Sequence, residues 1–183
     1  AKGVQNGAAE SVMFPTKIIE HAPRIINDLN TFFPAATDQH LIGPMAKIGW
    51  STPSLMEISL VVIISFSGDI GILGIVRVSL PTMEYSILNL QVNFIGALEF
   101  SKQRIWFYAV LFNSRILTIT IEGGFGLLIA WGSNSNFVVS VGGFHPSFTV
   151  PTLPFPNPDR LCISIINKSW AKLRVMAYFA VTS

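Results

Sequence analysis

Charged residues are scarce in this chain. Asp, Glu, Lys and Arg make up 12% of its 183 residues, whereas 50% are hydrophobic, and a typical soluble domain carries about 25% charged residues. The net charge is +2 and the basic residues are spread thinly. We therefore expect no nucleic-acid partner, because such a surface needs dense basic charge with exposed aromatics. The apolar surplus fits a membrane protein, a binder of apolar ligands, or one part of a larger assembly.

Residues that carry chemistry are also few. Cys162 is the single cysteine, which excludes an internal disulfide and a cysteine-based zinc site. The three histidines, His21, His40 and His145, have no metal-ligand spacing. The chain contains no Gly-x-Ser-x-Gly elbow, and its glycine-rich stretches lack the lysine of a phosphate loop. The sequence therefore predicts no catalytic residue, no metal and no cofactor, and a protein that is not an enzyme.

A long uninterrupted apolar run is missing as well. A membrane-spanning helix needs about 20 mostly apolar residues, and two acids and three serines interrupt the best candidate, Leu55 to Ile75. The stretch Ala1–Glu10 lacks the apolar core of a cleavable signal. An outer-membrane barrel is a third hypothesis, but Arg104–Phe112 is apolar on both faces, which disfavours a water-filled lumen.

Period-two alternation is what the sequence has in abundance. Between Leu88 and Phe100 every second residue is apolar or Gly, and Asn89, Gln91 and Asn93 lie between them, as in a long half-buried strand. We predict further strands at Glu57–Phe66, Ile70–Leu80, Arg104–Phe112, Arg115–Glu122, Gly124–Trp131, Phe137–Val141, Leu161–Ile165 and Lys172–Val181. Short connections between them favour an antiparallel meander. The predicted fold is mainly β: a curved sheet, a groove or an open barrel.

The N-terminal region follows a different period. Ile18, Ile25 and Leu29 recur at helical spacing within residues 11–33, and Pro23 predicts a kink or a break there. Residues 34–53 are predicted to be a loop. We therefore expect two parts, a lead-in with a short helical segment over residues 1–40 and an antiparallel β domain over residues 41–183.

Three short motifs stand out from this pattern. They are Gly49-Trp50-Ser51-Thr52-Pro53-Ser54-Leu55, Gly142-Gly143-Phe144-His145-Pro146 and Tyr178-Phe179-Ala180-Val181-Thr182-Ser183. Together with the run Leu90–Phe94 and the turn Asn113-Ser114-Arg115 they resemble a family of long, β-rich microbial proteins that is classed only as a domain of unknown function. The resemblance covers residues from about 40 to the end. It implies a β fold and a longer chain or a cleaved product, and it implies no activity.

The motif residues also have a physical interpretation. Gly142-Gly143 suits backbone angles that residues with a side chain tolerate poorly. We expect His145 to be a structural hydrogen-bonding residue, Trp50 a packing anchor and Cys162 a half-buried thiol.

Two functional hypotheses follow from the apolar strands. In the first, the apolar face of the sheet binds a lipid or another hydrophobic ligand. The predicted ligand-binding residues are Leu88, Leu90, Val92, Phe94, Leu98, Leu117, Ile119, Ile121, Phe125, Leu127 and Ile129. In the second, the chain is a structural subunit of a larger assembly, and partner chains cover the face. Lys172–Val181 runs toward the C-terminus without a proline or a block of charged residues that would prevent pairing along its edge. We therefore expect the unpaired N–H and C=O groups of this edge to pair with another strand or chain.

Overall fold

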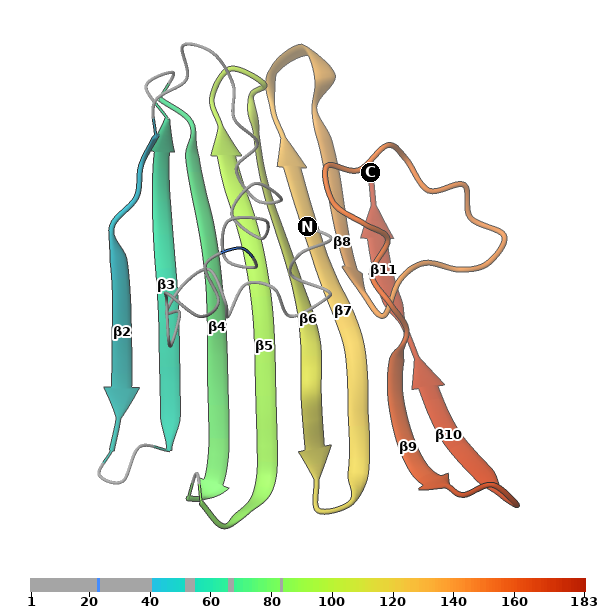
Figure 1. Cartoon of the computed structure of the whole chain (residues 1–183). Helices are drawn as coiled ribbons and strands as arrows, with labels where there is room; N and C mark the ends of the chain where they lie inside the picture. Colours follow the sequence, from blue (N-terminus) through green and yellow to red (C-terminus); the bar gives the residue numbers. More distant parts are fainter. Residues whose placement is uncertain (1–22, 24–40, 52–54, 66–67, 83) are drawn as a thin grey trace.

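The structure, a computed structural model, describes residues 23, 41–51, 55–65, 68–82 and 84–183. Within these residues, eleven strands form one antiparallel sheet with long strands side by side, and the sheet is not closed into a barrel (Figure 1). This confirms the mainly-β meander that the alternation predicts. The helical segment predicted within residues 11–33 lies, except for Pro23, outside the described residues.

Six long strands in chain order make the body of the sheet. The strands are β1 (Leu41–Ile42), β2 (Met45–Trp50), β3 (Met56–Ser65), β4 (Ile70–Pro81), β5 (Ser86–Glu99), β6 (Arg104–Ile116), β7 (Ile119–Ala130), β8 (Asn136–Val141), β9 (Leu161–Asn167), β10 (Lys172–Ala177) and β11 (Phe179–Thr182). From β3 to β8, each strand pairs with its neighbours in the chain order, β3 with β4 and so on to β7 with β8. Both β1 and β2 pair with the outer edge of β3, and β11 pairs with β8.

Several predicted boundaries are wrong. The region 34–53, predicted to be a loop, contains β1 and β2. Asn113-Ser114 is no hairpin turn but a bulge inside β6, where Asn113 has a φ of 50°. The turn follows at Leu117-Thr118, and β7 continues through Gly123-Gly124. Asparagine tolerates a left-handed conformation, so a turn-like sequence here produces only a bulge in a longer strand.

The last predicted strand, Lys172–Val181, is divided into β10 and β11. The division follows from a fork in the sheet. The strand β7 pairs with β8 through Phe125–Ala130 and with β9 through Thr120–Glu122. After pairing with β9 as β10, the chain therefore moves on to pair with β8 as β11. Figure 1 shows β9 and β10 diverging from the long strands.

The two sides of the sheet differ in chemistry. On one side the paired residues of β3 to β8 form three rows without a polar side chain, and we call these rows the apolar face. They are Ile64, Ile70, Leu98, Ile105, Ile129 and Phe137; Val62, Ile72, Gly96, Phe107, Leu127 and Val139; and Leu60, Gly74, Phe94, Ala109, Phe125 and Val141. The opposite side, the mixed face, alternates polar and apolar residues, for example Ser59, Ile75, Asn93 and Val110 in one row.

The hydrophobic core lies on the mixed face. Its buried residues include Val61, Leu73, Tyr108, Leu128 and Val138, together with Phe144 and Phe155 from the long loop between β8 and β9. The ring of Phe155 stacks 5.9 Å from that of Tyr108 and lies over Gly126, where an added Cβ would meet the ring at 2.5 Å. The small residues of β7 therefore leave room for the loop to pack on this side.

Candidate functional site: the apolar face

The structure brings most of the predicted ligand-binding residues to one side of the sheet. Leu88, Leu90, Val92, Phe94 and Leu98 alternate along β5, and Ile119, Ile121, Phe125, Leu127 and Ile129 alternate along β7. Their register through β6 places the two sets on the same side. Leu117 is the exception, because it lies in the turn before β7 with a φ of 53°.

The apolar face is the less buried side of the sheet. Ile64, Ile105, Ile129 and Phe137, all in one row, remain 37–44% exposed, whereas Asn93 on the mixed face is fully buried. The loop between β8 and β9 packs against the mixed face, where Phe144 and Phe155 join the core. Exposure of this much apolar surface to water is unfavourable, so covering the face would stabilise the protein.

Aromatic rings fill the centre of the apolar face. Phe94 stacks on Phe107 with ring centroids 5.6 Å apart, and Phe107 contacts Phe125 edge-on at 6.0 Å. Gly74 makes room for Phe94, since an added Cβ would lie 2.0 Å from its ring. Large side chains beside glycine give a filled surface rather than a deep groove.

A cavity on this face is small. It holds about 170 Å³ and is lined almost wholly by apolar side chains, among them Leu98, Ile105 and Leu127. Ligand pockets usually measure about 300–1,000 Å³. A ligand would therefore lie along the face rather than inside an enclosed site.

Both lateral edges of the sheet carry exposed strands. All six residues of β2 are exposed, and so are most of β10 and β11. Trp50 at the end of β2 is 70% exposed, so its predicted role as a packing anchor is wrong within this chain. Its register through β3 and β4 puts Trp50 on the side of the apolar face, which it extends.

The Gly-Gly-Phe-His-Pro motif lies at the fork of the sheet. An added Cβ on Gly142 would lie 2.4 Å from the carbonyl oxygen of Ala177, and its φ of 75° also favours glycine. Arg160 donates hydrogen bonds to the carbonyl oxygens of Gly142, at 3.1 Å, and Phe144. Its guanidinium also lies 3.9 Å from the ring centroid of Tyr178. Arg160 thus connects the segment that follows β8 with Tyr178, which lies between β10 and β11.

His145 fits the structural role that the sequence suggests. Its Nδ1 accepts a hydrogen bond from the backbone N–H of Ser147 at 3.1 Å, and its ring lies 6.2 Å from that of Tyr178. Cys162 is more buried than predicted, at 6% exposure. Arg160, which sequence reasoning did not single out, carries more contacts in this region than either residue. No local spacing marks it, because its partners are backbone carbonyls 16 and 18 residues away.

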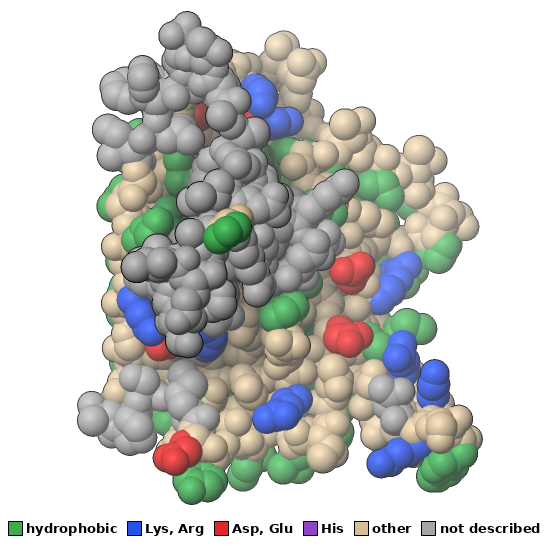
Figure 2. All heavy atoms as spheres, in the orientation of Figure 1, with side chains coloured by type: hydrophobic (Ala, Val, Ile, Leu, Met, Phe, Trp, Pro, Cys, Tyr) green, Lys and Arg blue, Asp and Glu red, His purple; other side chains and the backbone are tan. Residues whose placement is uncertain are grey.

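Charged side chains occupy the mixed face. Figure 2 views this side and shows acidic and basic groups gathered toward β9 and β10. On β3, Glu57 forms ion pairs with Lys47 of β2 at 3.0 Å and with Arg77 of β4 at 3.1 Å. Arg77 also donates a hydrogen bond to Gln91 of β5 at 3.3 Å. Glu57, Arg77 and Gln91 lie directly opposite one another on neighbouring strands, and Lys47 lies diagonally from Glu57. Such cross-strand pairs stabilise the register of the sheet.

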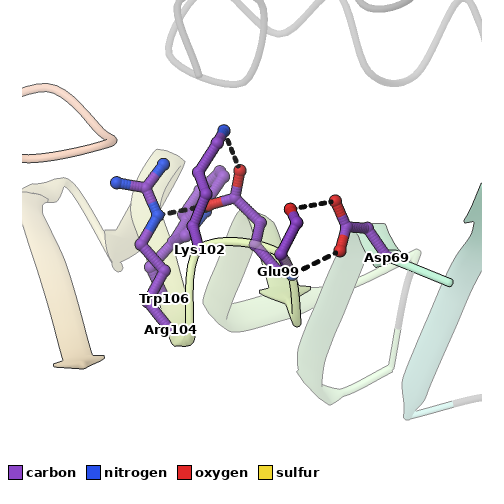
Figure 3. Close-up of polar contacts among 6 residues, drawn as sticks. Asp69, Glu99, Lys102, Arg104 and Trp106 are labelled. Carbon is purple, nitrogen blue, oxygen red and sulfur yellow. Dashed lines mark hydrogen bonds and ion pairs between the residues drawn. The ribbon is translucent and has the colours of Figure 1, made fainter. Parts of the chain in front are cut away.

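A second polar cluster lies at the turn between β5 and β6 (Figure 3). Glu99 accepts hydrogen bonds from Lys102, Arg104 and the indole N–H of Trp106. Burial of the Glu99 carboxyl opposes its charge, but the hydrogen bonds and charges of Arg104 and Lys102 outweigh burial and hold its pKa below the usual value. Asp69 accepts two hydrogen bonds from Ser101 in the same turn.

The fork also encloses a mixed-polarity cleft of about 520 Å³. Glu122, Asp159, Arg160 and Arg174 line it beside the buried thiol of Cys162. Opposite charges share this cleft, and Arg160 is already bonded to backbone carbonyls. The cleft therefore does not present charges of one sign, as a binding site for an anion or a cation would.

In the described part of the chain, no three His, Cys, Asp or Glu side chains are placed to hold a metal ion. No helix among the described residues is long and apolar enough to cross a membrane.

Comparison with known proteins gives one match. A protein-family model with the description "Family of unknown function (DUF6603)" matches residues 1–183. No curated protein and no solved structure matches the chain.

Proposed function

We propose that this chain, which belongs to the DUF6603 family of unknown function, is a non-enzymatic structural module of a larger protein assembly. In this proposal the apolar face is an interface that another protein layer covers. The observation that carries it is the inverted burial of the sheet. Rows without a polar side chain remain partly exposed, while Asn93 and Ser140 on the mixed face are fully buried.

The extent of the apolar face supports a protein partner. The three rows, about six residues long at 3.3 Å rise across six strands at about 4.8 Å spacing, span roughly 570 Å². The next row, Ile58, Val76, Val92, Leu111 and Gly123, brings the apolar side to roughly 730 Å². Exposed apolar patches on monomers rarely exceed a few hundred Å². A second layer about 10 Å away is the usual way to cover such a face in β-sandwiches.

A lipid or another hydrophobic ligand is the second candidate. It is favoured by the uninterrupted apolar rows that contain Phe94, Leu98, Phe125, Leu127 and Ile129. The small volume of the cavity and the filled surface around Phe107 disfavour it, because an acyl chain needs a concave site to lose most of its contact with water.

A photoreactive residue at position 129 tests which molecule covers the face. The chain carrying benzoylphenylalanine in place of Ile129 would be irradiated in the expressing cells, and the attached molecule would be identified by mass spectrometry and by lipid extraction. Placing the same group at Ile87, which is 55% exposed and lies outside the apolar face, provides the control.

We expect a protein adduct from position 129 and none of the same identity from position 87. A lipid adduct from position 129 would replace the proposal with the second candidate. Equal labelling from both positions, or no adduct from either, would show that the face has no specific partner and would overturn the proposal.

A further inference from the structure

The apolar face has the properties that self-association requires. In a two-fold symmetric dimer the same surface meets itself, so the surface has to be self-complementary. The three rows contain no charged and no polar side chain. Two copies can therefore meet along these rows without burying a charge or an unpaired polar side chain, both of which are costly.

The area of the face matches the area that a stable dimer buries. A standard protein interface buries about 800 Å² on each partner. The three rows span roughly 570 Å² by strand geometry, and the next row, Ile58, Val76, Val92, Leu111 and Gly123, extends the apolar side to roughly 730 Å². Tight packing also needs complementary surfaces, and the rings of Phe94, Phe107 and Phe125 supply the aromatic centre that interfaces favour.

We propose that a second copy of this chain covers the apolar face, so that two sheets stack with their apolar faces together. This inference rests on the proposed function and names the partner. Stacked sheets usually align within about 30° of each other at about 10 Å separation. The mixed faces, with the polar network around Glu57 and Arg77, would then form the two outer surfaces.

Sedimentation velocity of the 183-residue chain tests the oligomeric state. We expect a dimer at micromolar concentration for the unchanged chain. Ile105→Glu and Ile129→Glu, tested singly, place a charge at positions that are each 38% exposed in one copy. A single copy can hydrate this charge, whereas a stacked pair would bury it. We therefore expect at least a tenfold weaker dimer from either variant.

Ile87→Glu is the matched control, because it introduces the same charge at an exposed position outside the apolar face. It should leave the dimer unchanged. Far-ultraviolet circular dichroism would confirm that each variant keeps its β structure. If a Glu variant loses this structure, the milder Ile129→Thr replaces it in the same comparison, with a smaller but measurable weakening expected.

Three results would overturn the inference, and they are distinguishable. A monomer whose position 129 cross-links to a different protein would leave the proposed function intact but exclude a second copy. A monomer whose face carries lipid would overturn both. A dimer that survives both Glu variants would place the contact elsewhere, for example at the exposed edges β2 or β11.

Discussion

Glu99 shows how one side chain in this fold gains partners that its sequence neighbours supply. Lys102 and Arg104 follow it within five residues, and the turn after β5 brings both cations onto its carboxylate. Arg160 shows the opposite case, since its partners come from distant backbone. Local spacing could therefore suggest the Glu99 cluster, while only the fork of the sheet creates the Arg160 contacts.

Acid should remove the contribution of Glu99 to stability. Its pKa is lowered in the folded state from a usual value of 4.5, so its stabilisation is fully present above about pH 4.5 and is lost as the pH falls through the lowered folded pKa. We expect Glu99→Gln to reduce the free energy of unfolding by about 1–2 kcal/mol at pH 6 and by less at pH 3. Urea denaturation at both pH values measures this difference.

The exposed residue Glu84 provides the control for this experiment. Glu84→Gln should change the stability little at either pH. An effect of Glu99→Gln that is the same at pH 6 and pH 3 would show that the carboxylate charge is not what its partners stabilise.

At the scale of the strand, close packing between neighbours determines which small residues β4 requires. Gly74 and Phe94 pair across β4 and β5, and the ring occupies the place of a Cβ on Gly74. Gly71 on the same strand lies on the mixed face, where an added Cβ would find its nearest atom at 3.8 Å. The two glycines thus differ in what a methyl group would meet.

Gly74→Ala should therefore destabilise the protein by about 1–3 kcal/mol through overpacking. Phe94→Leu should relieve most of this effect when the two changes are combined, as a double-mutant cycle by chemical denaturation would reveal. Gly71→Ala is the matched control and should have a smaller effect. Strictly additive effects of Gly74→Ala and Phe94→Leu would contradict direct contact between the two positions.

The strand β11 carries the prediction made for the C-terminal edge. It pairs with β8 on one side, and among the described residues no strand pairs with its other side. If another strand or chain covers that outer edge, the amides of residues 179–182 should all exchange slowly, because each would be hydrogen-bonded. Hydrogen–deuterium exchange with residue resolution measures this protection, and fast exchange at alternate residues would show that the edge is free.

At the scale of the whole molecule, one side of the open sheet carries three rows without a polar side chain, and the other side alternates polar and apolar residues. The loop between β8 and β9 packs on the mixed face and supplies Phe144 and Phe155 to the core. The apolar face gains no such cover from the described residues. The scarcity of charge in the composition therefore matches one extended surface that a partner can cover.

The sequence by itself determined the long strands β3, β4 and β5 and their alternation. Period two is a local property of side-chain direction, so residues 57–66, 70–80 and 88–100 predict β3, β4 and β5 to within two residues. The alternation along β5 and β7 also identified ten strand residues that share one side of the sheet, although Leu117 lies in a turn.

Tertiary structure alone decided which side of the sheet is buried and where strands change partner. Burial depends on what packs against each side, and the residues of the loop between β8 and β9 meet Tyr108 only through long-range contacts. The fork at Gly124 and Gly142 likewise joins residues 18 apart by a backbone hydrogen bond of 2.8 Å. Local pattern cannot encode such contacts, because they depend on how the whole sheet assembles.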